Sequence, residues 1–179
     1  MADQLSWFRD SSKLIASGFS GVTNRSSLWS VSTTGAPPTK LRLDARSGTP
    51  SPDGTQVAFI NHDRTAIWLM NARGEAPRNV VIAAGDDTFW LVMWSADGRR
   101  LAFQRRHYSG NLDLGVGADR YYKRSLESVD LETGTVMASM PDLGIESAAA
   151  LPDGRILFLR PDPMGYNTSN DRGRRRPTL

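Results

Sequence analysis

A short motif recurs four times along this chain and restricts the folds that it can adopt. Each copy contains an apolar stub, a turn centred on an aspartate and an apolar stretch of strand length. The copies read WFRDSSKLIAS, PSPDGTQVAFI, WSADGRRLAFQ and ALPDGRILFL, with aspartates Asp10, Asp53, Asp97 and Asp153. The first two intervals between these aspartates are 43 and 44 residues, and the third is 56 residues. A period of about 40–45 residues is typical of a four-stranded propeller blade.

A second motif follows inside each of the first three units. It reads SLWSVSTTG, AIWLMNARG and SLESVDLETG. Together with the stub, the stretch after the aspartate and a weaker final segment, this motif gives each unit four strand-length segments. The segments are rich in Val, Ile, Leu, Phe and Trp, and Gly, Asp and Pro bound them. No stretch shows a sustained apolar period of about 3.6 residues, so we predict an all-β chain.

The repeated aspartates have a structural explanation. An aspartate side chain accepts hydrogen bonds from backbone amides one or two residues further on, and glycine takes a positive φ without steric cost. Ser11 stands where Gly54 follows Asp53 in the second unit, so we expect a looser turn in the first unit. We therefore assign the aspartates to turns rather than to catalysis. Four tryptophans also recur in register, and we expect them in the packing between blades: Trp7, Trp29, Trp68 and Trp94.

The segments SPDGTQVAFI and AIWLMNARGEAPRNVV closely resemble the TolB-type, WD-like propeller repeat of bacteria. In that family a W-S-P-D-G-like turn precedes an apolar strand, and an I-W/Y-x-M-N/D-x-x-G strand follows. The resemblance covers residues from about 5 to 160, with Pro50 and Ala150 where the family often has tryptophan. A weaker resemblance, carried by WSADGRRLAFQRR, SLESVDLETG and LPDGRILFLRPDP, is to the sensor propellers of bacterial receptor-type serine/threonine kinases. It implies a kinase domain and a membrane span elsewhere in a parent protein.

The repeat predicts a partial β-propeller of about three and a half four-stranded antiparallel blades, which forms an open arc. We expect blades at about residues 4–44, 45–83 and 84–140, an incomplete blade at 141–160, and a disordered Arg-rich tail at 161–179. No terminal strand is present to complete the fourth unit and close a ring. Such an arc leaves apolar faces and strand edges exposed at its ends. We expect a fragment of a longer protein or self-association of the open edges.

Charge and composition narrow the classes of partner. The formal net charge is +3, but Arg172, Arg174, Arg175 and Arg176 lie in the final segment. The body of repeats is therefore close to neutral, whereas a nucleic-acid-binding domain carries a basic patch on its folded body. The chain contains no cysteine, which excludes disulfides and thiolate metal sites. It shows no signal-peptide pattern, so we expect a cytoplasmic chain as written, or a periplasmic one if the parent is exported or membrane-anchored.

The candidate binding residues lie on the loops opposite the aspartate turns. Function commonly resides on variable loops held by a rigid scaffold. The extra residues of the third unit fall at His107–Arg124, and we expect the whole segment 105–124 to form a long loop there. Tyr and Arg are typical anchors of interfaces. The expected binding residues are Arg64, Arg106, His107, Tyr108, Tyr121, Tyr122 and Lys123.

No catalytic, metal or cofactor motif is identified. The two histidines, His62 and His107, are expected to be solvated, and Gly115-Val-Gly117 lacks the third glycine of a phosphate-binding loop. Neither kinase motifs nor the G-x-S-x-G of a serine hydrolase occurs. The sequence thus indicates a non-enzymatic module that binds or senses a protein or peptide. The alternative is a regulatory propeller segment of a bacterial serine/threonine kinase or a prolyl-oligopeptidase-type peptidase.

Overall fold

The computed structural model describes residues 2–20, 22–113, 118–140, 147–151, 153 and 155–159, and these form strands and turns without a helix. In this described part there is accordingly no helix that could span a membrane. The first sheet consists of β1 (Ala2–Trp7), β2 (Lys13–Ser20), β3 (Arg25–Ser32) and β4 (Thr39–Leu43), and the second of β5 (Ala45–Pro50), β6 (Gln56–Asn61), β7 (Ala66–Asn71) and β8 (Arg78–Ile82). The third consists of β9 (Thr88–Trp94), β10 (Arg100–Asp113), β11 (Ala118–Asp130) and β12 (Val136–Met140), followed by a pair, β13 (Ser147–Ala150) and β14 (Ile156–Leu159).

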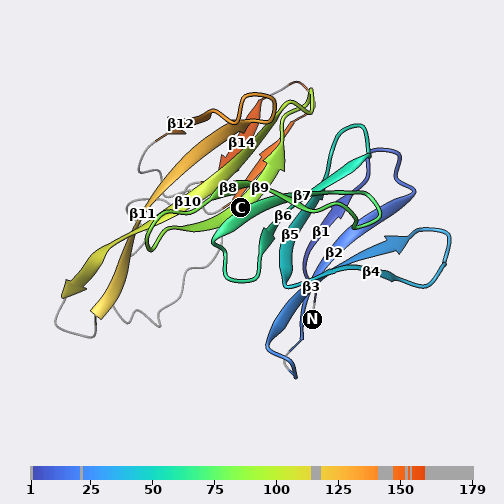
Figure 1. Ribbon diagram of the computed structural model, residues 1–179, viewed down its shortest axis with the longest axis horizontal. Helices are drawn as coiled ribbons and strands as arrows, with labels where there is room; N and C mark the ends of the chain where they lie inside the picture. Colours follow the sequence, from blue (N-terminus) through green and yellow to red (C-terminus); the bar gives the residue numbers. More distant parts are fainter. Residues whose placement is uncertain are drawn as a thin grey trace, which may run out of the picture.

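Within each sheet the strands are antiparallel and neighbour one another in the order of the sequence. We call the sheets blades 1, 2 and 3, and the β13–β14 pair sheet 4. Blade 1 lies on one side of the molecule and blade 3 on the other (Figure 1). The first strands of successive sheets face each other, because β5 contacts β1 and β9, and β9 contacts β13. The chain is therefore an all-β, partial β-propeller whose described residues do not close a ring, as the repeat predicts. The expected tail at residues 161–179 lies outside the described residues.

The prediction of a long loop at residues 105–124 is wrong. Strands β10 and β11 continue through most of the insertion and pair from Arg100 opposite Asp130 to Asp113 opposite Ala118, with one irregularity between Tyr108 and Asn111. The result is a β-hairpin that extends beyond blade 3 (Figure 1). Strand pairing satisfies the backbone amides and carbonyls of inserted residues, which a loop would leave to water. The segment at Arg46–Gly48, which joins the first two repeats, is likewise part of a strand, β5.

Two apolar clusters hold the three blades together. Phe8, Ile15 and Leu28 of blade 1 pack against residues of blade 2 that include Val57 and Phe59. A second cluster joins the opposite face of blade 2 to blade 3, and it comprises Ala58, Ile60, Ile67, Leu69, Val81, Phe89, Val92, Trp94, Leu101, Phe103 and Val129. Each blade therefore gains its stability from the face of its neighbour, because a single sheet cannot bury both of its faces alone.

The aspartate turns have the expected hydrogen bonds. In each repeat the aspartate Oδ1 accepts from the amide two residues further on, at 3.0–3.1 Å. In the second and third turns, the hydroxyls of Ser51 and Ser95 also donate to the aspartate. The first turn is not looser in its hydrogen bonds. Ser11 instead adopts the left-handed backbone with a φ of 57°, close to the 73° of Gly54, and this region is unfavourable for a residue with a Cβ.

The tryptophans differ in burial, although they recur in register. Trp94 is buried, and its indole nitrogen donates a hydrogen bond to the carbonyl of Thr49 in the preceding blade at 3.0 Å. Trp29 and Trp68 are half-buried, whereas Trp7 is exposed. The expectation that all four tryptophans pack between blades is therefore wrong for Trp7, and it is also wrong for Trp29, which projects from the same outward face of blade 1 through its pairing with Ala16. The reason is that no sheet in the described residues precedes blade 1.

Candidate functional site

The residues expected to form the binding site do not gather in one place. Arg64 lies in the turn between β6 and β7, and Arg106, His107 and Tyr108 follow one another on β10. Tyr121, Tyr122 and Lys123 lie on β11, where the side chains of the two tyrosines fall outside the described part. Among these candidates only Arg64 and Arg106 line the same cavity. The others follow the β10–β11 hairpin.

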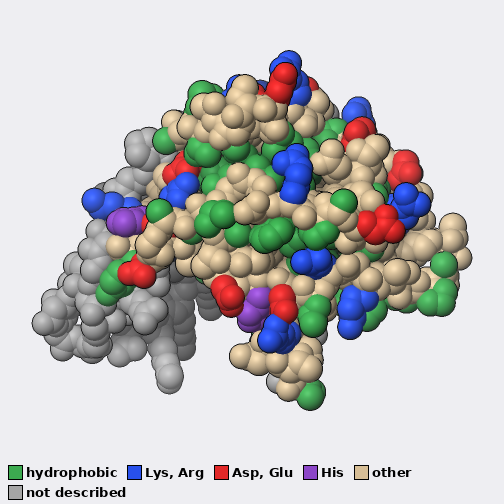
Figure 2. All heavy atoms as spheres, viewed as in Figure 1, with side chains coloured by type: hydrophobic (Ala, Val, Ile, Leu, Met, Phe, Trp, Pro, Cys, Tyr) green, Lys and Arg blue, Asp and Glu red, His purple; other side chains and the backbone are tan. Residues whose placement is uncertain are grey.

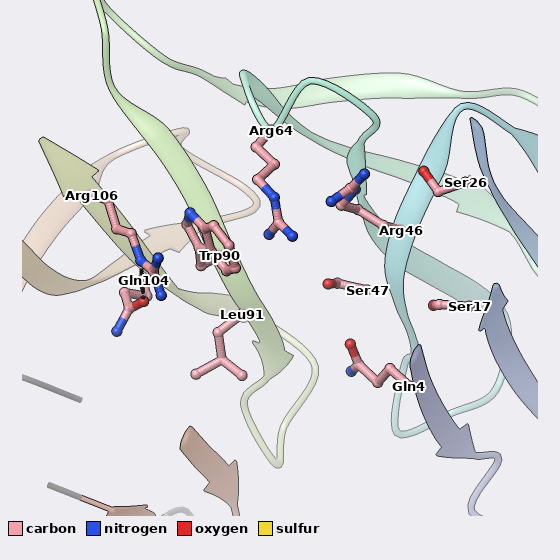
Figure 3. A pocket seen from close by; sticks show the side chains of 10 residues that line it. All are labelled: Gln4, Ser17, Ser26, Arg46, Ser47, Arg64, Trp90, Leu91, Gln104 and Arg106. Carbon is pink, nitrogen blue, oxygen red and sulfur yellow. Dashed lines mark hydrogen bonds between the residues drawn. The ribbon is translucent and has the colours of Figure 1, made fainter. Parts of the chain in front are cut away.

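The cavity has a volume of about 230 Å³ and lies where blades 1, 2 and 3 meet. It adjoins the first strand of each blade, β1, β5 and β9, and we call these the inner strands. Its walls come from β1, β2, β3, β5, β9, β10 and the β6–β7 turn (Figure 3). The lining residues are Gln4, Ser17, Ser26, Arg46, Ser47, Arg64, Trp90, Leu91, Gln104 and Arg106. Three of them are arginines and none is an aspartate or glutamate. Such a lining attracts an anionic group.

Irregularities of the inner strands shape this cavity. Gln4, Ser47 and Leu91 each lie six residues before the aspartate of their repeat, and all three line the cavity. The pairing register of β1, β5 and β9 shifts beside these residues. Ser47 and Leu91 have positive φ values of 54° and 47°, which are strained for residues other than glycine. Bulges of this kind re-aim side chains and often accompany binding sites.

An aromatic side chain forms one wall and is held between two cations. The guanidinium carbons of Arg64 and Arg106 lie 3.3 and 3.6 Å from the ring centroid of Trp90. Two groups this close to one ring must occupy its opposite faces, since they would otherwise overlap. The Nε of Arg106 also donates to Oε1 of Gln104 at 3.2 Å (Figure 3). The two arginines are therefore ordered by cation–π contact.

The third arginine, Arg46, is held by a histidine of its own blade that also contacts blade 1. Nη2 of Arg46 lies 3.3 Å from Nδ1 of His62, which is also 3.0 Å from the hydroxyl of Ser26. Because a guanidinium only donates, Nδ1 of His62 is the acceptor in the contact with Arg46. The buried Nε of Arg46 has no hydrogen-bond partner. The expectation of a solvated His62 is thus wrong, because this half-buried ring orients a cavity arginine.

A separate charged cluster fixes the base of the hairpin. The Nε of Arg105 donates to both carboxylate oxygens of Glu127 at 3.0 Å, and its Nη1 donates to Asp87, also at 3.0 Å. Nδ1 of His107 lies 2.5 Å from the other oxygen of Asp87. Asp87 and Glu127 are buried, so their charges depend on Arg105. His107 is therefore part of this structural cluster. In the described residues no group of three or more metal-binding side chains occurs.

Two hollows occur on the face that carries the aspartate turns. They have volumes of about 390 and 310 Å³ and share Arg9, Pro52 and Asp53. Both are larger than the cavity between the inner strands. However, each hollow is lined by both cationic side chains and the carboxylates of the turns. Neither therefore presents several side chains of the same charge to a ligand. We therefore place the candidate site at the inner-strand cavity.

Sequence reasoning missed Arg46, Trp90 and Gln104. Trp90 and Gln104 are opposite each other on neighbouring strands of blade 3, whereas Arg46 belongs to blade 2, so the packing of blade on blade brings Arg46 to them. One signal was available, since Gln4, Ser47 and Leu91 occupy a single position of the repeat. That position alone does not indicate that the side chains converge.

Comparison with known proteins supports the fold. No protein-family model and no curated protein matches the chain. Among solved structures, oligogalacturonate lyase from Vibrio parahaemolyticus is 17% identical with a TM-score of 0.60, over 85% of this chain and 44% of that one. The acylaminoacyl peptidase of Pyrococcus horikoshii is 15% identical with a TM-score of 0.62, over 83% and 26% of the two chains. TolB from Acinetobacter baumannii is 16% identical with a TM-score of 0.51, over 86% and 47%.

The chain spans less than half the length of each of these three proteins. At such low identities the comparison concerns the fold alone. The comparison agrees with the repeat motif, the order of strands in each sheet and the packing of blade on blade. The chain has the fold of a TolB-like β-propeller, and its described residues form three four-stranded blades and a two-stranded fourth sheet.

Proposed function

We propose that this chain is a non-enzymatic binding module that recognises carboxylate groups of an acidic peptide or protein segment at the inner-strand cavity. The observation that carries the proposal is the convergence of Arg46, Arg64 and Arg106 on a cavity without an acidic lining residue. A guanidinium donates two parallel hydrogen bonds to a carboxylate, and such charge-assisted pairs are stronger than neutral ones.

The remaining lining residues suit a peptide. Gln4, Gln104 and the serines offer donors and acceptors for a peptide backbone. Trp90 offers a rigid apolar wall whose position is set by its two arginine contacts. Tryptophan and arginine are enriched among residues that dominate binding energy at interfaces. The cavity is small, so it accommodates one or two acidic side chains of a longer segment rather than a folded partner.

The charge of the surface is consistent with a local site. Figure 2 shows lysines and arginines interspersed with aspartates and glutamates over the visible face, without a field of one sign. Long-range attraction by this face is therefore weak, and binding depends on contacts in the cavity. Such contacts weaken as salt concentration rises.

The test is titration with hexaglutamate, with hexaglutamine as the uncharged control peptide. We expect the wild-type chain to bind hexaglutamate and not hexaglutamine in isothermal titration calorimetry. Changing Arg46, Arg64 and Arg106 together to Gln is expected to weaken binding by at least about tenfold, since a hydrogen bond to a charged group contributes about 1.5–3 kcal/mol. The matched control changes three exposed arginines outside the cavity together to Gln, namely Arg9, Arg73 and Arg78. Equal affinity of both variants, or no binding by the wild type, would contradict the proposal.

A second candidate function is favoured by the likeness to the acylaminoacyl peptidase. In this alternative the chain is a regulatory propeller segment of a peptidase, or of a bacterial serine/threonine kinase, whose catalytic domain lies elsewhere in a longer protein. Reading the DNA on both sides of the coding sequence distinguishes the cases. An adjoining hydrolase or kinase domain supports this alternative, and further repeats alone support an independent binding module.

A further inference from the structure

The face of blade 1 that points away from blade 2 is apolar. In an antiparallel pair, directly opposite residues project from the same face of the sheet. Leu5 pairs with Ala16, Trp7 pairs with Leu14, and Ala16 pairs in turn with Trp29. These five residues form the apolar part of the open face of blade 1. Lys40 pairs with Trp29 on the same face, and its Nζ lies 4.9 Å from the Trp29 ring centroid. Leu5 and Trp7 are 58% and 57% exposed. An exposed apolar patch of this kind marks an interaction surface.

The same positions are interfaces elsewhere in the molecule. Trp94, Leu101 and Phe103 of blade 3 correspond in the repeat to Trp7, Leu14 and Ala16, and they are 6%, 0% and 0% exposed. They pack against the face of blade 2 that is turned toward the next blade in the sequence, which we call its downstream face. The open face of blade 1 is therefore one half of a contact that the arc already makes twice, and it fits the downstream face of another blade-like sheet.

The other end of the arc presents such a face. The turn of sheet 4 is one residue shorter than that of blade 2, since Ile156, three residues after Asp153, is opposite Ala150, whereas Val57, four residues after Asp53, is opposite Pro50. In the pairing, the next residue, Leu157, therefore takes the place of Ala58. Ala58 is fully buried in the contact of blade 2 with blade 3. Leu157 is 61% exposed. The two ends of the arc formed by the described residues thus expose complementary halves of the same inter-blade contact.

We propose that a second copy of this chain covers the open face of blade 1 with the downstream face of its sheet 4. The contact is head-to-tail, because the two halves lie at opposite ends of the arc. Head-to-tail contacts form a ring if the rotation closes and a filament if it does not. Two copies joined at both ends would contain eight sheets, twice the four that the described residues of one chain form, which is within the usual range of four to eight blades.

The first test is the mass of the full chain by sedimentation over a range of protein concentrations. We expect the wild type to be a dimer or larger, and Trp7→Asp to raise the dissociation constant by at least about tenfold, as is typical for a central tryptophan of an interface. Val22→Asp is the control, since Val22 is exposed in the β2–β3 turn and is not on the open face. Leu5→Asp repeats the test, and circular dichroism verifies that each variant is folded.

The second test examines the head-to-tail arrangement. Leu157→Asp changes the opposite end and is expected to weaken association as much as Trp7→Asp does. A mixture of the two variants retains one intact contact, formed by the open face of the Leu157→Asp chain and sheet 4 of the Trp7→Asp chain. We expect this mixture to associate more strongly than either variant alone.

Three outcomes would overturn the proposal. A wild-type chain that is a monomer at all concentrations would leave a sheet of a longer protein as the occupant of the open face. A Leu157→Asp variant that associates as the wild type does would indicate contact between two open faces. An equal effect of Val22→Asp would indicate non-specific aggregation.

Discussion

Trp7 and Trp94 occupy the same position of the repeat, three residues before the aspartate, yet their surroundings are opposite. Trp94 is buried against blade 2 and donates to the carbonyl of Thr49, whereas Trp7 is exposed at the end of the arc. The local structure is the same, since Trp7 pairs with Leu14 as Trp94 pairs with Leu101. The repeat therefore determines strands and turns, and the neighbouring sheet determines which residues become core.

The largest expected effect is the difference in the free energy of unfolding between a variant that lacks Trp94 and one that lacks Trp7. Trp94→Ala removes a buried side chain and is expected to lower the free energy of unfolding by about 3–5 kcal/mol. Trp7→Ala is expected to lower it by less than about 1 kcal/mol in the monomer, as for a surface substitution. Urea unfolding at protein concentrations too low for association measures both values. Similar losses for the two variants would show that blade 1 is covered within a single chain.

The comparison also shows what the sequence could predict. The strands and the aspartate turns follow from local properties, namely strand-forming residues, glycine and the acceptor oxygen of aspartate. The hairpin strands of the insertion and the exposure of Trp7 were missed. The first depends on pairing between β10 and β11 across an irregularity at Tyr108, and the second depends on a missing neighbour.

The cavity was only partly predictable for a related reason. Arg64 and Arg106 were expected on the loop face, but their convergence on Trp90 requires the relative placement of blades 2 and 3. The backbone strain at Ser47 and Leu91 could not be expected either, because neither residue type favours a positive φ. Short-range patterns describe a blade, whereas a site between blades is set by the packing of one blade on another.

An intermediate effect on the free energy of unfolding is expected at the glycines in the turn between the third and fourth strands of each blade. Gly35 and Gly74 both have a positive φ, of 84° and 88°, but a Cβ at Gly74 would lie 2.7 Å from the backbone oxygen of Leu41 in blade 1. A Cβ at Gly35 would meet nothing within 4 Å. Gly35→Ala is therefore expected to cost about 1–2 kcal/mol from backbone conformation alone. Gly74→Ala is expected to cost about 1–3 kcal/mol more, because the two blades must move apart.

Thermal and urea unfolding of both alanine variants measure this difference, with Gly134→Ala as a further control. Gly134 has a φ of 71° and nothing within 4 Å of a Cβ, so it should behave as Gly35 does. Equal losses at Gly35 and Gly74 would show that the turn of blade 2 does not rest on blade 1.

The smallest expected effect concerns the turns, in which blades 1, 2 and 3 are alike. Hydrogen bonds from Ser12 to Asp10, and from the Ser51 and Ser95 hydroxyls to Asp53 and Asp97, lower the pKa of these carboxyl groups below the usual 3.8. A carboxyl whose pKa is lowered by folding stabilises the fold fully above its unfolded pKa, and this contribution is lost as the pH falls through the folded pKa. The free energy of unfolding should therefore decrease below about pH 4.

Changing all three aspartates to Asn keeps an acceptor oxygen in each turn and removes the titration. We expect the triple variant to be less stable than the wild type at pH 7 but to lose less further stability between pH 5 and pH 3. The effect is small because these carboxylates are close to solvent, where interactions of charge are weak. An unchanged acid dependence in urea unfolding would show that other carboxyl groups, such as the buried Asp87 and Glu127 beside Arg105, control the response of the fold to acid.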